Sequence, residues 1–325
     1  MNTSTSKNAL ILALTFLSVG TAFAQADNFP SRPITIVVPY PAGGTSDGQV
    51  RMIQEKLGKL LGQPVVVENK SGASGAIAAQ FVARSKADGN TLLFPNTGVL
   101  IAPLVNDKAG YDPLKDFKPI TTMTTVPMVL VASKSVPGNG LTDFLQYARS
   151  QPQGIQYASA GPASFGHVAS ARFAQMAGIK VEHVPYRGEA VTTMAVRTGE
   201  VQMLLTTPSS AMLGQVQQGN IKMLGVATAN ASPLLPGVLT LNKTVPGFTS
   251  AIWFGLLAPA GTPDDVVAKI NAAVKVVMDD QAIRDKLQPT GAMAQTSTPA
   301  EFAKLMKDES AQLREVIGKY GIKAE

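Results

Sequence analysis

Short apolar runs alternate with amphipathic patterns along most of this chain, and this order limits the possible folds more than any other feature. In the first hundred residues, apolar runs predict strands at 34–39, 65–68 and 91–94. Helical spacing predicts helices between them at 50–61 and 75–83. This βαβ order favours an α/β fold with a parallel sheet, helices on both faces, and ligands bound beyond the carboxyl ends of the strands.

A second βα series follows a crossing segment. The apolar run 126–133 is expected to leave the first domain, and 221–227 is expected to return to it. The pattern between the crossings predicts helices at 141–149, 165–177, 189–197 and 211–217, and strands at 155–158, 181–184 and 201–205. Two crossings define a two-strand hinge between two βα domains.

The rest of the chain is expected to complete the first domain. Pro and Gly punctuate 233–247, which predicts a loop wrapped over that domain, and amphipathic helices at 264–278 and 299–319 would close it. Thr262 and Thr298 each precede a proline, so both are expected to be N-caps with Pro at the first helical position. The predicted domains are 25–127 with 225–325, and 128–224.

Two glycine-bearing loops, 40–47 (YPAGGTSD) and 159–167 (SAGPASFGH), each join an apolar run to a helical pattern. The start of a helix leaves backbone N–H groups unpaired, and the macrodipole adds about half a positive charge there. Each loop therefore resembles half of an anion pocket. A carboxylate held between two such loops needs no arginine, which favours capture of a small anion over chemistry on it.

The amino terminus has the pattern of a secretory signal peptide. Lys7 is the only charge before Asp27, the run 9–17 is almost wholly apolar, and Ala22-Phe-Ala24 has the small-x-small form of a cleavage site. The run is shorter than the roughly 20 residues that span a membrane, which argues against an anchor. We expect cleavage after about Ala24 and a soluble, periplasmic mature protein.

Composition excludes several classes. With 45% hydrophobic and 15% charged residues, the chain can bury a core without disulfides, and it has no Cys. The net charge of +6 comes from scattered basic residues without an aromatic-interleaved stripe, so no nucleic-acid partner is expected. Metal-ligand spacings, a phosphate-binding loop and a dinucleotide fingerprint are all missing, so neither a metal nor a cofactor is expected.

Six segments in order along the mature chain carry a family resemblance. They are 38–44 with Asp47 and Arg51, 65–70, 72–75, 159–161, 183–188 (HVPYRG) and 253–263 (WFGLLAPAGTP). Together they resemble the substrate-binding proteins of tripartite tricarboxylate transporters, the Bug or TctC family. The resemblance implies a type II periplasmic binding protein fold with a ligand cleft between two domains. It also implies a monomer that closes on a small carboxylate and delivers it to inner-membrane permease subunits.

The resemblance places one carboxylate at the first loop. The substrate-binding positions it implies in the first domain are Tyr40, Ala42, Gly43, Gly44, Thr45, Ser46, Asp47 and Thr97. An anionic ligand is repelled by Asp47, which is more consistent with a cap on its own helix and an i,i+4 ion pair with Arg51. Gly43 and Gly44 let backbone amides approach a ligand closely.

In the second domain, the implied substrate-binding positions are Ser159, Ala160, Gly161, Ser164, His167, Tyr186, Arg187, Thr206 and Thr207. His167 falls in the first turn of a helix, where the dipole favours a neutral imidazole, and it either donates to the ligand or only orders the loop. His183 is expected to be structural. Arg187 is either a bidentate clamp on a carboxylate or an ordinary surface arginine.

Two departures from the family pattern bear on the ligand. Ala171 and the pair Thr206 and Thr207 stand where many relatives carry an acid. Without an acid, the ammonium group of an amino acid would stay unpaired after closure, which is costly. We therefore expect an amine-free di- or tricarboxylate, or an aromatic carboxylate.

Two other function classes remain open on the sequence. A secreted serine hydrolase needs a nucleophile beside an oriented base, and the chain has only two histidines. A ligand-sensing protein that feeds a membrane signalling partner would share the same fold. We expect a binder that works by hinge closure, with ligand shifting the population towards the closed form.

Overall fold

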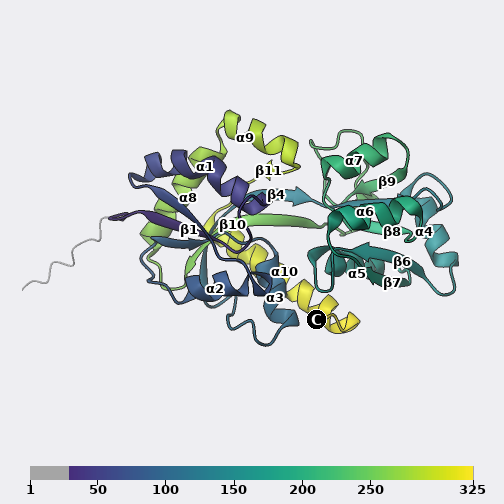
Figure 1. The fold of residues 1–325 in the computed structure, drawn as a ribbon, viewed down its shortest axis with the longest axis horizontal. Coiled ribbons are helices and arrows are strands. Elements are labelled where there is room, and N and C mark those ends of the chain that lie inside the picture. Colours follow the sequence, from purple (N-terminus) through teal and green to yellow (C-terminus); the bar gives the residue numbers. More distant parts are fainter. Residues whose placement is uncertain (1–28, 325) are drawn as a thin grey trace, which may run out of the picture.

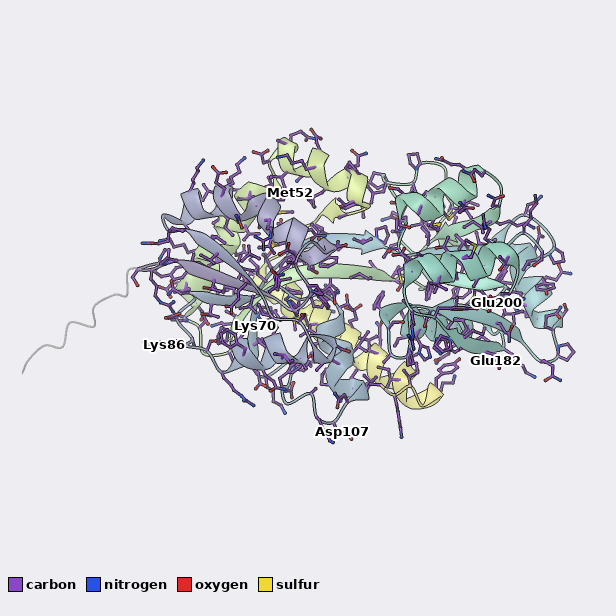
Figure 2. The ribbon with its side chains drawn as sticks, viewed as in Figure 1. Met52, Lys70, Lys86, Asp107, Glu182 and Glu200 are labelled. Carbon is purple, nitrogen blue, oxygen red and sulfur yellow. The ribbon has the colours of Figure 1, made fainter. Side chains whose placement is uncertain are left out.

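The structure, a computed structural model, describes residues 29–324. Two sheets, each covered by helices, form two lobes that extended chain connects (Figure 1). Side chains fill the space between the elements of each lobe (Figure 2). The expected signal peptide and its cleavage after Ala24 lie outside the described residues.

Six strands in the order β11-β4-β10-β3-β1-β2 form the sheet of the first lobe. β1 pairs in parallel with β2 and β3, as the βαβ order predicts. β10 runs antiparallel to β3 and β4, and β11 antiparallel to β4, so the prediction of a parallel sheet is wrong here. The strands are β1 (Ile34–Val38), β2 (Val65–Asn69), β3 (Thr91–Leu93), β4 (Phe117–Pro127), β10 (Ala251–Pro259) and β11 (Met293–Ala294).

The two faces of this sheet bury separate cores. Along β1, Ile34, Ile36 and Val38 pack in one core and Val37 in the other, because successive side chains of a strand point to opposite faces. α1, α8 and α9 cover the first face, and α2, α3 and α10 the second. The helices are α1 (Thr45–Leu61), α2 (Ala76–Ala83), α3 (Gly98–Val105), α8 (Asp264–Met278), α9 (Gln281–Leu287) and α10 (Pro299–Tyr320), with 3₁₀ turns η1 (Ala73–Gly75) and η3 (Gln288–Thr290).

The second lobe repeats this arrangement around a sheet in the order β7-β6-β8-β5-β9. β6 is parallel to β7 and β8, whereas β5 is antiparallel to β8 and β9, so this sheet is also mixed. Its strands are β5 (Val129–Ser133), β6 (Ile155–Ser159), β7 (Val181–Pro185), β8 (Met203–Thr206) and β9 (Ile221–Val226). Its helices are α4 (Leu141–Ser150), α5 (Phe165–Ala177), α6 (Glu189–Thr198) and α7 (Ser210–Gln217), with the 3₁₀ turn η2 (Leu241–Lys243).

The hinge lies where three extended segments meet. β4 continues into β5 through Met128, whose N–H donates to the Ser250 carbonyl at 3.0 Å. Met128 in turn accepts from the Ala227 N–H at 2.8 Å, and the Ser250 N–H donates to the Ala227 carbonyl at 2.9 Å. The first crossing is therefore at the predicted place, within 126–133.

The return crossing differs from the prediction. β9 pairs with β5 inside the second sheet, so 221–227 does not carry the chain back, and the crossing lies near Ser250. The segment 233–247 is not wrapped over the first lobe, because Leu241 and Val245 belong to the core of the second. Phe248 also packs there, edge-on to Phe173 with ring centroids 5.1 Å apart. Apolar contacts that a local pattern does not reveal decide which lobe this segment joins.

The two predicted threonine caps have different outcomes. Thr298 caps α10 in a capping box, in which its hydroxyl accepts from the Glu301 N–H and the Glu301 carboxylate accepts from the Thr298 N–H. Thr262 does not cap α8, because its hydroxyl donates to the Pro259 carbonyl at 2.8 Å and Pro263 is the N-cap. Because this hydroxyl bonds to the preceding turn, it does not accept a hydrogen bond from the first N–H groups of α8.

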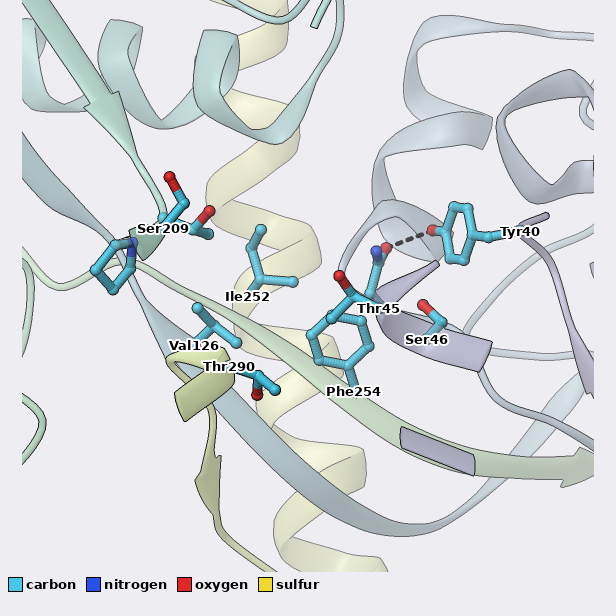
Figure 3. A pocket seen from close by; sticks show the side chains of 11 residues that line it. Tyr40, Thr45, Ser46, Val126, Ser209, Ile252, Phe254 and Thr290 are labelled. Carbon is cyan, nitrogen blue, oxygen red and sulfur yellow. Dashed lines mark hydrogen bonds between the residues drawn. The ribbon is translucent and has the colours of Figure 1, made fainter. Parts of the chain in front are cut away.

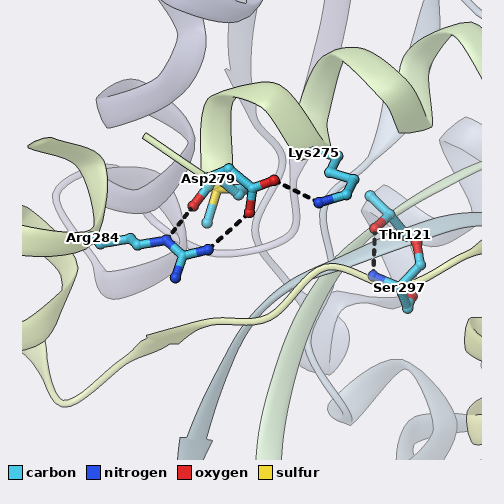
Figure 4. Close-up of polar contacts among 6 residues, drawn as sticks. Thr121, Lys275, Asp279, Arg284 and Ser297 are labelled. Carbon is cyan, nitrogen blue, oxygen red and sulfur yellow. Dashed lines mark hydrogen bonds and ion pairs between the residues drawn. The ribbon is translucent and has the colours of Figure 1, made fainter. Parts of the chain in front are cut away.

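Polar contacts hold both ends of the segment between α8 and α10, which contains α9 and η3. Asp279, at the end of α8, accepts from Lys275 at 2.5 Å and from Arg284 at 2.8 Å (Figure 4). Thr121 and Ser297 are hydrogen-bonded between β4 and the segment before α10 (Figure 4). These contacts position α9 and η3, whose last residue, Thr290, lines a cavity between the lobes.

None of the helices within residues 29–324 combines the length and apolar character needed to cross a membrane.

Candidate functional site

Two adjoining cavities, of about 320 and 490 Å³, lie between the lobes and share Tyr40, Asn96 and Ile252 in their walls. We call them together the front cleft. Both volumes are typical of small-molecule sites. Figure 3 shows the smaller cavity, with Ser209 on one side and Thr45 and Ser46 on the other.

The start of α1 opens onto the front cleft. Its N-cap is Gly44, and no side chain caps the helix. Thr45 and Ser46, in the first turn, line the smaller cavity. The first N–H groups of a helix have no intrahelical partner, so this end can receive an anion.

Asp47 orders the first loop from behind. Its Oδ2 accepts from the Gly43 N–H at 2.9 Å and from Arg51 Nε at 2.8 Å. The hydrogen bond from Arg51 is the largest cause that lowers the pKa of Asp47, to about 2. Asp47 does not line the front cleft. Its carboxylate therefore has the structural role that the sequence favoured, and it holds Gly43 at a φ of 79°.

Tyr40 and Asn96 form the shared wall of the front cleft. The Tyr40 hydroxyl donates to Asn96 Oδ1 at 2.6 Å (Figure 3). The Gly98 N–H donates to the same oxygen at 2.8 Å. Burial raises the pKa of Tyr40, so its hydroxyl stays protonated. Thr97 lines the larger cavity, and its hydroxyl accepts from the Trp253 N–H at 3.2 Å. Asn96 was not among the predicted site residues.

The second glycine loop uses its polar groups internally. The Ser159 hydroxyl lies 2.9 Å from the Gly161 carbonyl, to which it donates, and 2.6 Å from His183 Nε2. Ser159 is only 1% exposed. A serine hydroxyl beside a histidine is also the start of a catalytic dyad, but this one is buried and already donates to the main chain. Ser159 also does not line the front cleft, so its hydroxyl is not placed to attack a ligand bound there.

His167 also ties this loop together. Ser164 caps α5 by accepting from the His167 N–H at 3.3 Å, and His167 Nδ1 accepts from the Ala163 N–H at 3.2 Å. The His167 ring stacks on His183 with centroids 3.6 Å apart. Burial, and then the neighbouring His183, lower the pKa of His167 to about 4, which confirms the expected neutral imidazole. Burial is the larger of the two causes, so the imidazole is neutral for a reason other than the helix dipole that the sequence suggested.

The strand ends at β7 and β8 differ from the expectation. The Tyr186 hydroxyl donates to Glu200 at 2.7 Å, and neither Tyr186 nor Arg187 lines the front cleft. Thr206 and Thr207 both donate to Glu189 Oε1 at 3.3 Å. An acid is thus present behind these threonines, supplied by α6 rather than by the strand end.

The predicted positions divide into two groups. Those that line the front cleft are Tyr40, Thr45, Ser46, Thr97, Ala160, Ser164 and Thr207. Those that do not are Ala42, Gly43, Gly44, Asp47, Ser159, Gly161, His167, Tyr186, Arg187 and Thr206. In the second group, Asp47, Ser159 and His167 hold the two loops through hydrogen bonds, whereas Ala42, Gly43, Gly44 and Arg187 are exposed to solvent.

The floor of the smaller cavity was missed by the sequence analysis. Val126 of β4 lies opposite Ile252 of β10, and Phe254 follows on the same face (Figure 3). Pro208 and Ser209, just before α7, complete the second-lobe side. The alternation along β4 and β10 was the available signal, but it required knowing that these strands pair.

The described side chains that line the front cleft carry no charge. Among residues 29–324 there is also no group of three or more acidic or histidine side chains able to hold a metal ion. Main-chain N–H groups, hydroxyls and amides are therefore the polar groups that the front cleft offers.

Comparison with known proteins agrees with this architecture. Residues 49–322 match the model of the family described as the tripartite tricarboxylate transporter family receptor, TctC. The chain belongs to the TctC family. Its two-lobed α/β structure is the type II periplasmic binding fold of TctC and Bug proteins.

Relatives of this TctC protein include the UPF0065 protein in the tcbD-tcbE intergenic region of Pseudomonas sp. strain P51. It is 33% identical over 96% of this chain and 94% of its own length. The solved structure of R. palustris Rpa4515 with adipate has a TM-score of 0.73 and 33% identity, covering 91% of this chain and 99% of that one. MatC from Rhodopseudomonas palustris with bound malate has a TM-score of 0.69 and 32% identity, covering 89% and 100%.

Proposed function

We propose that this TctC protein is a periplasmic solute-binding protein that captures a small carboxylate in the front cleft. The observation that carries the proposal is the uncapped start of α1, where Thr45 and Ser46 line a cavity shared by both lobes. A helix N-terminus attracts a carboxylate through its free N–H groups and its dipole. Two structural relatives hold adipate and malate, both carboxylates.

The chemistry of the walls points to an amine-free ligand with an apolar body. Val126, Ile252 and Phe254 form an apolar floor, with Thr45 on one side and Ser209 on the other. None of the described lining side chains is an acid that would pair with an ammonium group. The amine-free preference therefore remains our proposal, with a di- or tricarboxylate or an aromatic carboxylate as the ligand class.

Contact between Glu189 and the ammonium group of a ligand would contradict this preference for amine-free ligands. Glu189 accepts hydrogen bonds from Thr206 and Thr207, and Thr207 lines the front cleft. If Glu189 reached an ammonium group, the protein would bind aspartate or glutamate well. Removing its charge in Glu189→Gln would then selectively weaken the binding of amino acids.

Calorimetry tests the proposal directly. The mature protein is titrated with adipate, malate, terephthalate, aspartate and glutamate. We expect binding to at least one amine-free carboxylate, and weaker binding of both amino acids. Tighter binding of aspartate or glutamate than of every amine-free acid would contradict the ligand class. Saturating ligand at about 100 times its Kd should also add about 2.7 kcal/mol to the free energy of unfolding.

We further propose that the closed protein acts as a monomer and is recognised by the permease subunits of a tripartite transporter, without catalysis. No turnover of the bound carboxylate is expected. Ser159→Ala, which removes the hydroxyl beside His183, should leave the ligand chemically unchanged, just as the native protein does. Product formation by the native protein that is lost in Ser159→Ala would instead identify a hydrolase.

A further inference from the structure

The paired strands β4 and β10 form a ribbon with a cavity on each side. Val126 lies opposite Ile252, and both face the front cleft. The neighbouring pairs, Thr125 with Trp253 and Pro127 with Ala251, line a different cavity of about 530 Å³. Because successive side chains of a strand alternate between faces, this rear cavity lies behind the same ribbon.

Both lobes supply walls to the rear cavity. From the first lobe, α10 contributes Leu305, Glu309 and Gln312. From the second lobe, α5 contributes Val168 and Arg172, and the segments beside the hinge contribute Thr228, Ala229 and Thr249. A rotation of the lobes about the ribbon therefore changes the front cleft and the rear cavity in opposite directions.

No direct ion pair joins the lobes across this space in the described part of the chain. Arg172 donates to the Thr249 carbonyl at 2.8 Å, within its own lobe. Glu309 accepts from Trp253 Nε1 at 2.5 Å, also within its own lobe. Burial raises the pKa of Glu309 to about 7, so near neutrality much of this carboxyl is uncharged and attracts Arg172 weakly.

Gln175 of α5 donates to Glu315 of α10 at 3.2 Å, and Val168 of α5 packs in the core that α10 covers, so the two walls touch at one end of the cavity. Away from that contact, the empty volume governs how closely the walls approach.

We propose that the rear cavity sets the affinity of the front cleft, because its walls must approach one another when the lobes open and separate when they close. Bulk added to the rear cavity then disfavours the open form. A larger fraction of the ligand-free protein becomes closed, and the apparent Kd falls in proportion to that fraction. This inference rests on the proposed function for its affinity readout, but its effect on lobe closure is independent of any ligand.

The first test fills the cavity at an exposed position. Ala229 lines the rear cavity and Ala231, in the same loop, lines none of the described cavities, so Ala229→Trp and Ala231→Trp form a matched pair. Without ligand, Ala229→Trp should have a smaller radius of gyration in solution scattering than the native protein. Its Kd for adipate should fall by about fivefold. Ala231→Trp should match the native protein in both measurements.

The second test enlarges the cavity. Leu305 lines it and is 38% exposed, while Leu60 on α1 is 46% exposed and lines none of the described cavities. Leu305→Ala should raise the Kd for adipate by about threefold through a more open ligand-free form. Leu60→Ala should not change it. Circular dichroism and thermal melting confirm that each variant is folded.

The outcomes separate the two proposals. If the native protein binds none of the carboxylates tested, the proposed function fails, and scattering of the ligand-free variants still decides the role of the rear cavity. If Ala229→Trp is folded and has the same radius of gyration as Ala231→Trp, the rear cavity does not control closure. A larger radius of gyration without ligand, or a higher Kd for adipate, in Ala229→Trp than in the native protein would also overturn the inference.

Discussion

The two glycine loops look alike in sequence but differ in how their polar groups are used. In the first loop, Asp47 accepts from Gly43 and leaves the start of α1 without a side-chain cap. In the second, Ser164 caps α5 and His167 accepts from the Ala163 N–H. A loop whose N–H groups already donate to its own side chains has fewer free N–H groups to donate to a ligand. We therefore expect the first loop to contribute most of the anion affinity.

The largest effect is expected from a charge placed at the start of α1. Thr45→Asp puts a carboxylate where the ligand carboxylate is proposed to bind, and it should raise the Kd for adipate by roughly hundredfold, equivalent to about 2.7 kcal/mol. The same charge in Ser164→Asp should have a much smaller effect, because Asp also caps a helix and this end is already occupied. Calorimetry measures both, with Thr45→Asn as the uncharged control. Equal losses in the two aspartate variants would contradict the asymmetry between the loops.

A smaller effect is expected from the backbone of the first loop. Gly43 has a φ of 79°, and no atom within 4 Å would obstruct an added Cβ. Gly43→Ala should therefore cost ~1–2 kcal/mol through conformational strain alone. The loss should appear in the free energy of unfolding, or in the Kd if the loop relaxes away from its binding geometry.

Gly48→Ala is the matched control, since Gly48 lies inside α1 with equally open surroundings. It should increase the free energy of unfolding by ~0.5–1 kcal/mol, because Gly is a poor helix former. A destabilisation in Gly48→Ala as large as that in Gly43→Ala would show that backbone strain is not the cause.

The second loop should respond to pH. Because the folded-state pKa of His167 is about 4, below the ordinary value near 6.5, the unfolded chain binds more protons between these values. The free energy of unfolding should therefore fall as the pH decreases from about 6.5 to 4. Urea unfolding of the native protein and His167→Gln over this range measures the effect. An equal pH dependence in both proteins would assign it to another group.

The smallest effect is expected at the strand end after β7. Arg187 and Tyr186 do not line the front cleft, and the Tyr186 hydroxyl donates to Glu200. Arg187→Ala and Tyr186→Phe should each change the Kd for adipate by less than about twofold, as expected of surface side chains. A tenfold increase in the Kd for adipate in Arg187→Ala would instead support the alternative in which Arg187 is a bidentate clamp on a carboxylate.

Local patterns predicted the regular elements well where the periodicity is strong. The predicted helices 165–177 and 264–278 coincide with α5 and α8, and Thr298 is the predicted N-cap of α10. The antiparallel strand β10 was not predicted. Its sequence is a short apolar run that resembles any buried strand, and its direction depends on the chain returning through the hinge.

The same limit applies to the site. Thr45, Ser46 and Thr207 were predicted and line the front cleft. Asn96, Ile252 and Ser209 line it too but were missed. Each of these depends on the way in which segments distant in sequence come together. Conversely, Ser159 has the residue type of a ligand contact, but its hydroxyl is committed to neighbours in the loop and to β7.

The sequence by itself determined the βα order, the family, the starts of α5 and α10 and the polar, glycine-bearing character of the first loop, because most of these depend on residues close together in the chain. Tertiary structure alone decided the lobe joined by the segment 233–247, the return crossing near Ser250 and the pairing of β4 with β10. Those features arise from apolar burial and strand pairing between residues that are far apart in sequence. They also decide which side chains face the front cleft and which face the rear cavity.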